Sequence, residues 1–200
     1  NLAATDQMLD SPTNNFCTLN PLDHGALTFS EGNLTVTNTA NDTAHETRGT
    51  LSLTGKHYWE VVRQDTPGEQ GATMGVCSTD IEFTTNTVYI GYYPNTSGIY
   101  GSGQHRNGSS TIVATYATQS AGSIMMFAYD ADTGKFWIGK DGTWFNSGVP
   151  ASGTGHVSVV PNYATKTYSP AVTAHNNVKV VANFGQDSSF AGNKTAQGNA

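Results

Sequence analysis

The sequence predicts an all-β fold, an antiparallel β-sandwich, and three observations support this prediction. Charged residues make up only 12% of the 200 residues, against roughly 25% in an ordinary globular protein. Gly, Asn, Ser and Thr take their place, and these residues favour turns and short strands over helices. No segment shows sustained helical periodicity of apolar residues, whereas short alternating segments recur between turns. A chain of this length suits one large β domain.

The expected strands follow one another along the chain, separated by polar turns. The first half contains them at residues 27–29, 34–37, 47–53, 57–62, 73–77 and 88–92. Residues 94–110 form a long Gly-rich connection, interrupted only by Ile99 and Tyr100. The second half contains strands within 122–144, at 168–174 and at 178–184, and the last two form a closing hairpin around Asn176 and Asn177. This many short strands is typical of a sandwich.

Residues 122–144 carry the clearest local signal, because they form three expected strands joined by two tight turns. Residues 132–134 close the first hairpin, and Gly134 can adopt the positive φ that such turns require. Asp141 and Gly142 close the second hairpin, and this dipeptide is a strong hairpin signal. The first of these strands is apolar on both faces, so we expect it in the middle of the sandwich.

Several motifs occur in an order that resembles the SPRY domain family. They are the segment 55–61 with its Tyr-Trp-Glu-Val sequence, then 74–77, 89–92, 99–101, 122–144, 168–172 and 178–185. The resemblance covers about residues 48–185 and implies a concanavalin A-like jelly-roll sandwich that is used mainly for binding. It leaves residues 1–47 as an N-terminal segment that packs on or extends the sandwich, and 186–200 as an irregular tail.

The Asn-, Gly-, Ser- and Thr-rich loops and the two ends of the chain resemble a bacteriophage group of SPRY-containing virion proteins. This resemblance implies a non-enzymatic protein of the virion surface, such as a tail fibre or a capsid or tail decoration. Its implied partners are a host-surface glycan or protein and other virion proteins, contacted through loops at residues 93–107 and 143–154. Virion appendages are usually symmetric, so we expect a homo-oligomer.

The charge and the cysteine content argue against several other functions. The net charge is −6 and the nine Lys and Arg residues are scattered, whereas nucleic-acid binding needs a clustered basic face. No apolar run is long enough to span a bilayer. Cys17 and Cys77 lack metal or redox spacing, and the apolar run around Cys77 predicts a buried, reduced thiol. We therefore expect no metal, no cofactor, no nucleic acid and no membrane insertion.

Catalysis is not predicted either. Carboxylates two residues apart occur as Asp80 with Glu82, in a loop, and as Asp130 with Asp132, in a turn. Retaining glycosidases need two carboxylates about 5 Å apart on one face, which strands provide and turns do not. No Gly-x-Ser-x-Gly elbow is present for nucleophilic catalysis. A carbohydrate-binding lectin-like protein or a glycan hydrolase on the same fold stays open as the alternative function.

Aromatic residues provide the candidate ligand-binding residues. Trp59 and Trp137 lie within expected strands, where burial is the ordinary role of tryptophan, whereas Trp144 follows a turn and is expected to be exposed. The other candidates lie in or beside the Gly-rich connection and are Tyr92, Tyr93, Tyr100, His105 and Arg106. Loops on rigid scaffolds carry recognition, and Tyr with Ser, Gly and Asn is the composition of adaptable binding loops. A solvated loop without a ligand, or a structural contact between virion proteins, stays open beside this reading.

Overall fold

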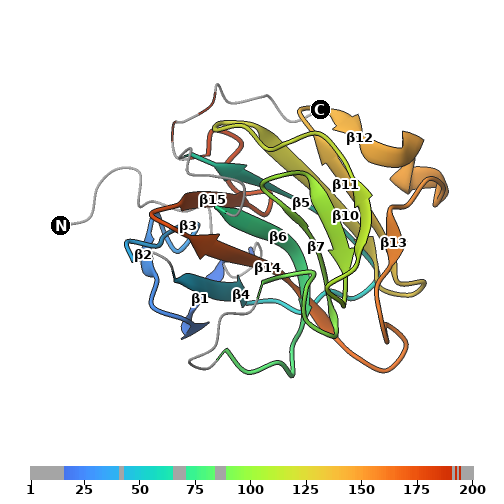
Figure 1. Ribbon diagram of the computed structural model, residues 1–200, viewed down its shortest axis with the longest axis horizontal. Coiled ribbons are helices and arrows are strands. Elements are labelled where there is room, and N and C mark those ends of the chain that lie inside the picture. The colour runs from blue at the N-terminus through green and yellow to red at the C-terminus, as the bar shows by residue number, and fades with distance from the viewer. Residues whose placement is uncertain are drawn as a thin grey trace.

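The computed structural model describes residues 16–40, 43–64, 71–83, 89–190, 192 and 194. Over these ranges the protein consists of two antiparallel sheets packed face to face (Figure 1), with two short 3-10 helices and no α-helix. The 3-10 helices are η2 (Phe145–Ser147) and η3 (Pro150–Ser152). The predicted all-β sandwich is therefore confirmed.

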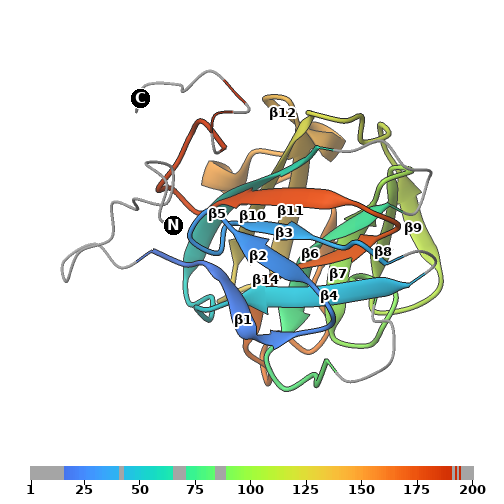
Figure 2. The same ribbon diagram turned by 90° about the vertical axis from the view of Figure 1, so that its left-hand side faces the viewer.

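One sheet has seven strands among the described residues, and Figure 2 shows it running from β1 to β9. In spatial order these are β1 (Leu19–His24), β4 (Ala44–Gly49), β14 (Tyr168–His175), β6 (Ala72–Ser78), β7 (Thr96–Tyr100), β8 (Gln104–Asn107) and β9 (Ile112–Thr115). We call it the seven-stranded sheet.

The second sheet has eight strands over the same ranges, and we call it the eight-stranded sheet. In spatial order seven of them are β12 (Thr143–Trp144), β11 (Lys135–Lys140), β10 (Ile124–Asp130), β5 (Lys56–Arg63), β15 (Lys179–Asn183), β3 (Thr35–Thr37) and β2 (Thr28–Ser30). The eighth strand, β13 (Ser158–Val159), pairs with β11 outside this path.

The hydrophobic core lies between the two sheets. Trp59 on β5, Phe127 on β10 and Ile138 on β11 pair side by side across three strands and all face this core. The rings of Trp59 and Phe127 stack with their centroids 5.5 Å apart. Burying side chains of this size contributes roughly 1.5–3 kcal/mol each to folding. Successive side chains on these strands point alternately inward and outward, so the next rung faces away from the core.

The meander predicted over residues 122–144 is confirmed as β10, β11 and β12. Gly134 has the expected positive φ of 69° in the first turn. In the second turn Asp141 and Gly142 both have positive φ, 47° and 85°, as a two-residue type I′ hairpin requires. Local turn chemistry therefore sets this part of the fold.

Two expectations about the middle of the chain are wrong. Of the strand expected at 88–92, residue 88 lies outside the described residues and 89–92 form no strand. The supposed loop at 94–110 contains the paired strands β7 and β8. The backbones of β6 and β7 approach closely where Gly75 pairs with Gly98. A Cβ on Gly75 would lie only 2.0 Å from the carbonyl oxygen of Ser97, so no side chain fits there. Small residues are required at this contact, and they hid β7 from a prediction based on bulky apolar residues.

The expected closing hairpin is also wrong. β14 pairs with β4 and β6 in the seven-stranded sheet, whereas β15 pairs with β5 and β3 in the eight-stranded sheet. Asn176 and Asn177 both have positive φ, 56° and 58°, as a tight turn allows. The turn carries the chain from one sheet to the other, where each strand lies between two neighbours of its own sheet.

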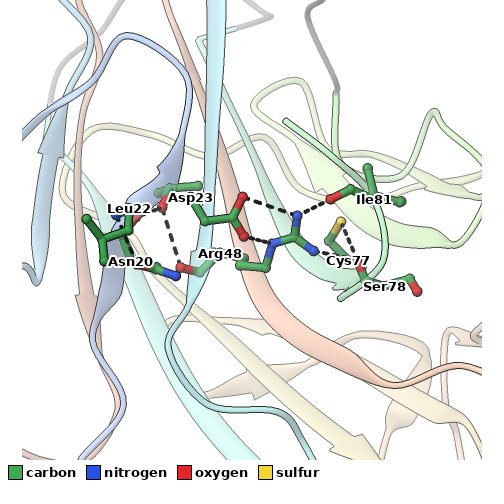
Figure 3. Close-up of polar contacts among 8 residues, drawn as sticks. Asn20, Leu22, Asp23, Arg48, Cys77, Ser78 and Ile81 are labelled. Atoms are coloured by element: carbon green, nitrogen blue, oxygen red, sulfur yellow. Dashed lines mark hydrogen bonds and ion pairs between the residues drawn. The ribbon is translucent and has the colours of Figure 1, made fainter. Parts of the chain in front are cut away.

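Arg48 on β4 is a buried cation on the outer side of the seven-stranded sheet, and Figure 3 shows its polar contacts. Its Nε lies 2.5 Å from Oδ2 of Asp23 on β1, and its Nη1 donates to the carbonyl oxygen of Ser78 at 2.7 Å. Its Nη2 donates to the carbonyl oxygen of Ile81, and the guanidinium lies 4.2 Å from the ring centroid of Phe83. One side chain thus joins β1, β4 and the loop after β6.

Cys77 lies beside this network, and it is a free and fully buried thiol as predicted. Burial raises its pKa to about 12. Cys17 is also free, so no disulfide joins the two cysteines.

Candidate functional site

The structure divides the six predicted ligand-binding residues into three groups. Tyr92, Tyr93, Tyr100 and Arg106 come together on the outer side of the seven-stranded sheet, and we call them the tyrosine–arginine surface. His105 lies inside the sandwich. Trp144 lies on the other sheet, at β12.

Arg106 holds the tyrosine–arginine surface together. The carbon at the centre of its guanidinium lies 5.4 Å from the ring centroid of Tyr92 and 5.0 Å from that of Tyr100, within the range of cation–π attraction. Its Nη1 donates to the carbonyl oxygen of Ser110 at 2.6 Å, and its Nη2 donates to Oε1 of Gln104 at 3.1 Å. The cation is therefore fixed in place before any ligand arrives.

The turn that presents the two exposed tyrosines is fixed by one threonine. The hydroxyl of Thr96 donates to the carbonyl oxygen of Tyr93 at 2.6 Å and accepts from the backbone N–H of Gly91 at 2.8 Å. The rings of Tyr92 and Tyr93 lie 5.6 Å apart, and these residues are 42% and 37% exposed. Both rings are therefore available to a partner.

Tyr100 supports this surface from below and is almost entirely buried. The residue is only 7% exposed, and its ring stacks on that of Tyr89 at 5.9 Å. Burial raises the pKa of the Tyr100 hydroxyl well above its ordinary value, although the nearby charge of Arg106 acts in the opposite direction. Tyr100 thus positions Arg106 and stays neutral at physiological pH.

His105 lies in β8 and not in a loop, and its ring is fully buried. Its Nε2 lies 3.3 Å from the hydroxyl of Ser97 and 3.4 Å from that of Ser158. Burial lowers the pKa of His105 to about 4, so the ring is neutral near pH 7. Side chains alternate along β8, so His105 points inward and Arg106 points outward. A strand predicted at 104–107 would have separated these two residues in the same way.

Trp144 belongs to a pocket that sequence reasoning missed. The pocket has a volume of about 250 Å³, lies on the outer side of the eight-stranded sheet, and we call it the Tyr58–Trp144 pocket. Its lining residues are Lys56, His57, Tyr58, Ala128, Tyr129, Asp130, Trp137, Trp144, Pro150 and Ala151. They come from β5, β10, β11, β12 and η3.

The walls of this pocket are aromatic and its base is small. Tyr58, Ala128 and Trp137 pair side by side across β5, β10 and β11, on the rung that faces away from the core. The rings of Tyr58 and Trp144 meet edge to face, with centroids 6.1 Å apart and an angle of 74° between their planes. Tyr58 is 51% exposed, and the only sequence signal for it was its alternation with the buried Trp59.

Trp137 is buried, as predicted, yet it faces outward and is covered by the segment after β12. Its Nε1–H donates to the carbonyl oxygen of Thr154 at 2.7 Å. Gly148 must be small there, because a Cβ at that position would lie 2.9 Å from the Trp137 ring. The 3-10 segment therefore forms one rigid wall of the pocket.

The carboxylates considered for glycoside hydrolysis have other partners. Asp80 is ion-paired with Lys166 and accepts from the Ser78 hydroxyl, and the hydrogen bond from Lys166 lowers the pKa of the Asp80 carboxyl. Oδ1 of Asp130 accepts the backbone N–H of Asp132 at 3.1 Å. A general acid needs a raised pKa, which Asp80 lacks.

The described ranges hold no cluster of three or more His, Cys, Asp or Glu placed to bind a metal ion. Across those same ranges, none of the helices has the length and apolar character needed to cross a membrane.

No protein-family model and no curated protein matches the chain. Its structure is similar to solved SPRY domains. The SPRY domain of human HERC1 matches with a TM-score of 0.62 and 14% identity, over 84% of this chain and 98% of that one. The TRIM65 PSpry domain matches with a TM-score of 0.61 and 13% identity, over 84% and 90%. The structure of stonustoxin matches with a TM-score of 0.60 and 13% identity, over 84% of this chain and 28% of the stonustoxin chain. The chain therefore has the SPRY β-sandwich fold.

Proposed function

We propose that this protein is a non-enzymatic binding module on the surface of a bacteriophage particle. Its tyrosine–arginine surface contacts a protein, either on the host surface or in a neighbouring virion subunit. The observation that carries this proposal is the fixed guanidinium of Arg106 beside the exposed rings of Tyr92 and Tyr93.

Three properties of this surface favour a protein partner. Tyr and Arg are enriched among the residues that dominate the energy of protein interfaces. The hydrogen bonds that hold Arg106 reduce the entropy lost when a partner binds. The surface is exposed and presented by a turn above a rigid sheet, which is the ordinary place for recognition. The likeness to SPRY domains, a fold used mainly for binding, supports the same role.

The phage assignment rests on the resemblance of the loops and chain ends to SPRY-containing virion proteins. A low charge content with many Asn, Thr and Gly residues also suits the outside of a particle. A tail fibre or a capsid or tail decoration would bring several copies together as a homo-oligomer. Repetition of a weak site on one particle would raise its overall avidity by roughly 10²–10⁴.

The non-enzymatic assignment is supported by the partners of the candidate carboxylates. Asp80 is held by Lys166 with a lowered pKa, and Oδ1 of Asp130 accepts the backbone N–H of Asp132 in a turn. A glycan hydrolase on the same fold remains the alternative. Release of reducing sugar from bacterial polysaccharides that is abolished by Asp80→Asn would favour this alternative and overturn the binding-module proposal.

A selection from a random peptide library tests the protein-binding surface. We expect peptides enriched on the wild-type protein to bind the double variant Tyr92→Ala/Tyr93→Ala at least tenfold more weakly, because each lost aromatic contact costs about 1–2 kcal/mol. Tyr58→Ala is the matched control, since it removes an exposed tyrosine from the opposite sheet. Peptides that bind the double variant as tightly as the wild type would refute the surface assignment.

Immunogold labelling tests the location on the particle. Antibodies raised against the chain should decorate purified particles of the phage that encodes it, visible by negative-stain electron microscopy. Labelling found only in the particle-free fraction of the lysate would contradict the proposed location.

A further inference from the structure

We propose that the Tyr58–Trp144 pocket binds a single neutral hexopyranose ring of a glycan. This site is separate from the tyrosine–arginine surface, because the two lie on different sheets and on opposite outer sides of the sandwich. The inference therefore does not depend on the proposed protein partner.

The aromatic walls match the apolar side of a sugar. A hexopyranose has a face of C–H bonds surrounded by a rim of hydroxyl groups. The ring of Trp144 meets that of Tyr58 at an angle of 74°, which forms a corner and not a flat platform. A six-membered ring placed in this corner can pack its C–H face on one aromatic ring and its edge on the other, which removes apolar surface from water.

Small residues create the space for the ring. Ala128 lies between Tyr58 and Trp137 on the same rung, so the base of the pocket is a methyl group flanked by two large side chains. Gly139 pairs with Trp144, and a Cβ there would lie 3.1 Å from Cε3 of the indole. Its absence lets the Trp144 ring lie close against β11.

The polar end of the pocket provides a donor and an acceptor. Lys56 and Asp130 are direct cross-strand neighbours on β5 and β10, on the same outward side as Tyr58. Oδ1 of Asp130 accepts from Asp132, and neither Oδ2 nor the Lys56 ammonium has a hydrogen-bond partner among the described residues. One carboxylate oxygen and one ammonium can therefore accept from and donate to neighbouring sugar hydroxyls.

Size and charge narrow the ligand further. A volume of about 250 Å³ lies just below the range of drug-sized pockets, roughly 300–1,000 Å³, and suits one ring. Aromatic walls alone would accept a cation. Here the Lys56 ammonium and the Asp130 carboxylate are neighbours of opposite charge, so their effects on a charged ligand oppose one another and the pocket favours neither a cation nor an anion. A neutral ring with several hydroxyls satisfies both groups.

Titration with simple sugars tests the pocket. The probes are the methyl glycosides of glucose, galactose, mannose and N-acetylglucosamine, observed by ¹H–¹⁵N NMR on the wild-type protein. We expect at least one to bind with a dissociation constant on the order of 1 mM, as a ligand of this size allows. The indole N–H signal of Trp144 should shift, while that of the core residue Trp59 stays in place.

Variants distinguish this pocket from other sites. Trp144→Ala should weaken binding at least tenfold, and Ala128→Leu should do the same by filling the base of the pocket. Tyr93→Ala is the matched control and should bind the glycoside as the wild type does, although it removes part of the tyrosine–arginine surface. If the peptide selection fails while the glycoside still binds, the proposed protein-binding function is refuted and the sugar pocket is not.

The pocket assignment would be overturned by three results. One is the absence of binding by every glycoside at concentrations on the order of 10 mM, ten times the expected dissociation constant. Another is a glycoside titration in which only NMR signals of residues outside the pocket lining shift. This measurement uses the wild-type protein, so it does not depend on whether a variant folds. The third is unchanged binding by a folded Ala128→Leu or Trp144→Ala protein.

Discussion

Replacing Arg48 with Met should destabilise the fold strongly, because it removes a buried cation and leaves its partners in place. The Arg48 side chain is 6% exposed, and its ion-pair partner Asp23 is 32% exposed. The carbonyl oxygen of Ile81 would lose its donor, whereas that of Ser78 would keep the backbone N–H of Ile81 at 3.3 Å. An unsatisfied buried acceptor costs about 1–3 kcal/mol. Asp23 reaches water in part, so its own penalty is smaller.

We expect Arg48→Met to lower the free energy of unfolding by about 3–5 kcal/mol, the usual cost of breaking a buried ion pair from one side. A protein of this length has a total stability of about 5–15 kcal/mol, and the melting temperature should fall by roughly 6–20 °C. Urea unfolding followed by tryptophan fluorescence measures the loss, and an unchanged slope with denaturant would show that the unfolded state is the same.

The exposed ion pair between Asp80 and Lys166 is the matched control. Asp80→Asn should cost less than about 1 kcal/mol, since surface pairs contribute little. In the Arg48→Met background, Asp23→Ala should have a much smaller effect than in the wild type, because the two charges act as one unit. A loss below about 1 kcal/mol for Arg48→Met would refute the reasoning, since it would mean that water or another donor replaces the guanidinium.

Three further predictions concern stability and reactivity. Burial lowers the pKa of His105 to about 4, so between pH 6.5 and 4 the unfolded state binds a proton that the folded state does not. The free energy of unfolding should therefore fall by roughly 3 kcal/mol from pH 6.5 to 4. Urea titrations across this range should show no such fall for His105→Gln. Gly75→Ala should cost about 3 kcal/mol because its Cβ would lie 2.0 Å from the Ser97 carbonyl oxygen. Gly55→Ala should cost only about 1 kcal/mol, because no atom lies within 4 Å of the added Cβ and only the φ of 72° opposes a side chain. Equal losses of stability for the two variants in thermal melts would show that the contact with Ser97 does not determine the cost at Gly75. Cys77, with its pKa of about 12, should resist iodoacetamide until the protein unfolds, and rapid labelling of the folded protein would show the burial to be wrong.

The sequence predicted best the parts of the fold that local chemistry determines. The turn at Asp141 and Gly142 needs positive φ at two adjacent positions, and few dipeptides supply it as readily. The burial of Trp59 likewise followed from a strand rich in aromatic and β-branched residues. In both cases the determining interactions lie within a few residues along the chain.

The parts that failed depend on distant contacts. β7 contains Ser97 and Gly98, which have little strand preference of their own. It pairs closely with β6 because Gly75 leaves room for its backbone. The Tyr58–Trp144 pocket depends on two aromatic residues far apart in the sequence, brought together by β10 and β11. Neither pairing leaves a periodic signal near the residues themselves.

The placement of β14 and β15 has a consequence for synthesis of the protein on the ribosome. Each is an inner strand of a different sheet, yet both follow every other strand of the described residues in sequence, at residues 168–175 and 179–183. Until they emerge, β4 and β6 have no strand between them, and β5 and β3 are likewise separated. The nascent chain therefore exposes several open strand edges until these two strands are made, and such edges pair readily with other chains. Both sheets can close only after residues 168–183 have left the ribosome, so we expect a chain cut before residue 168 to aggregate.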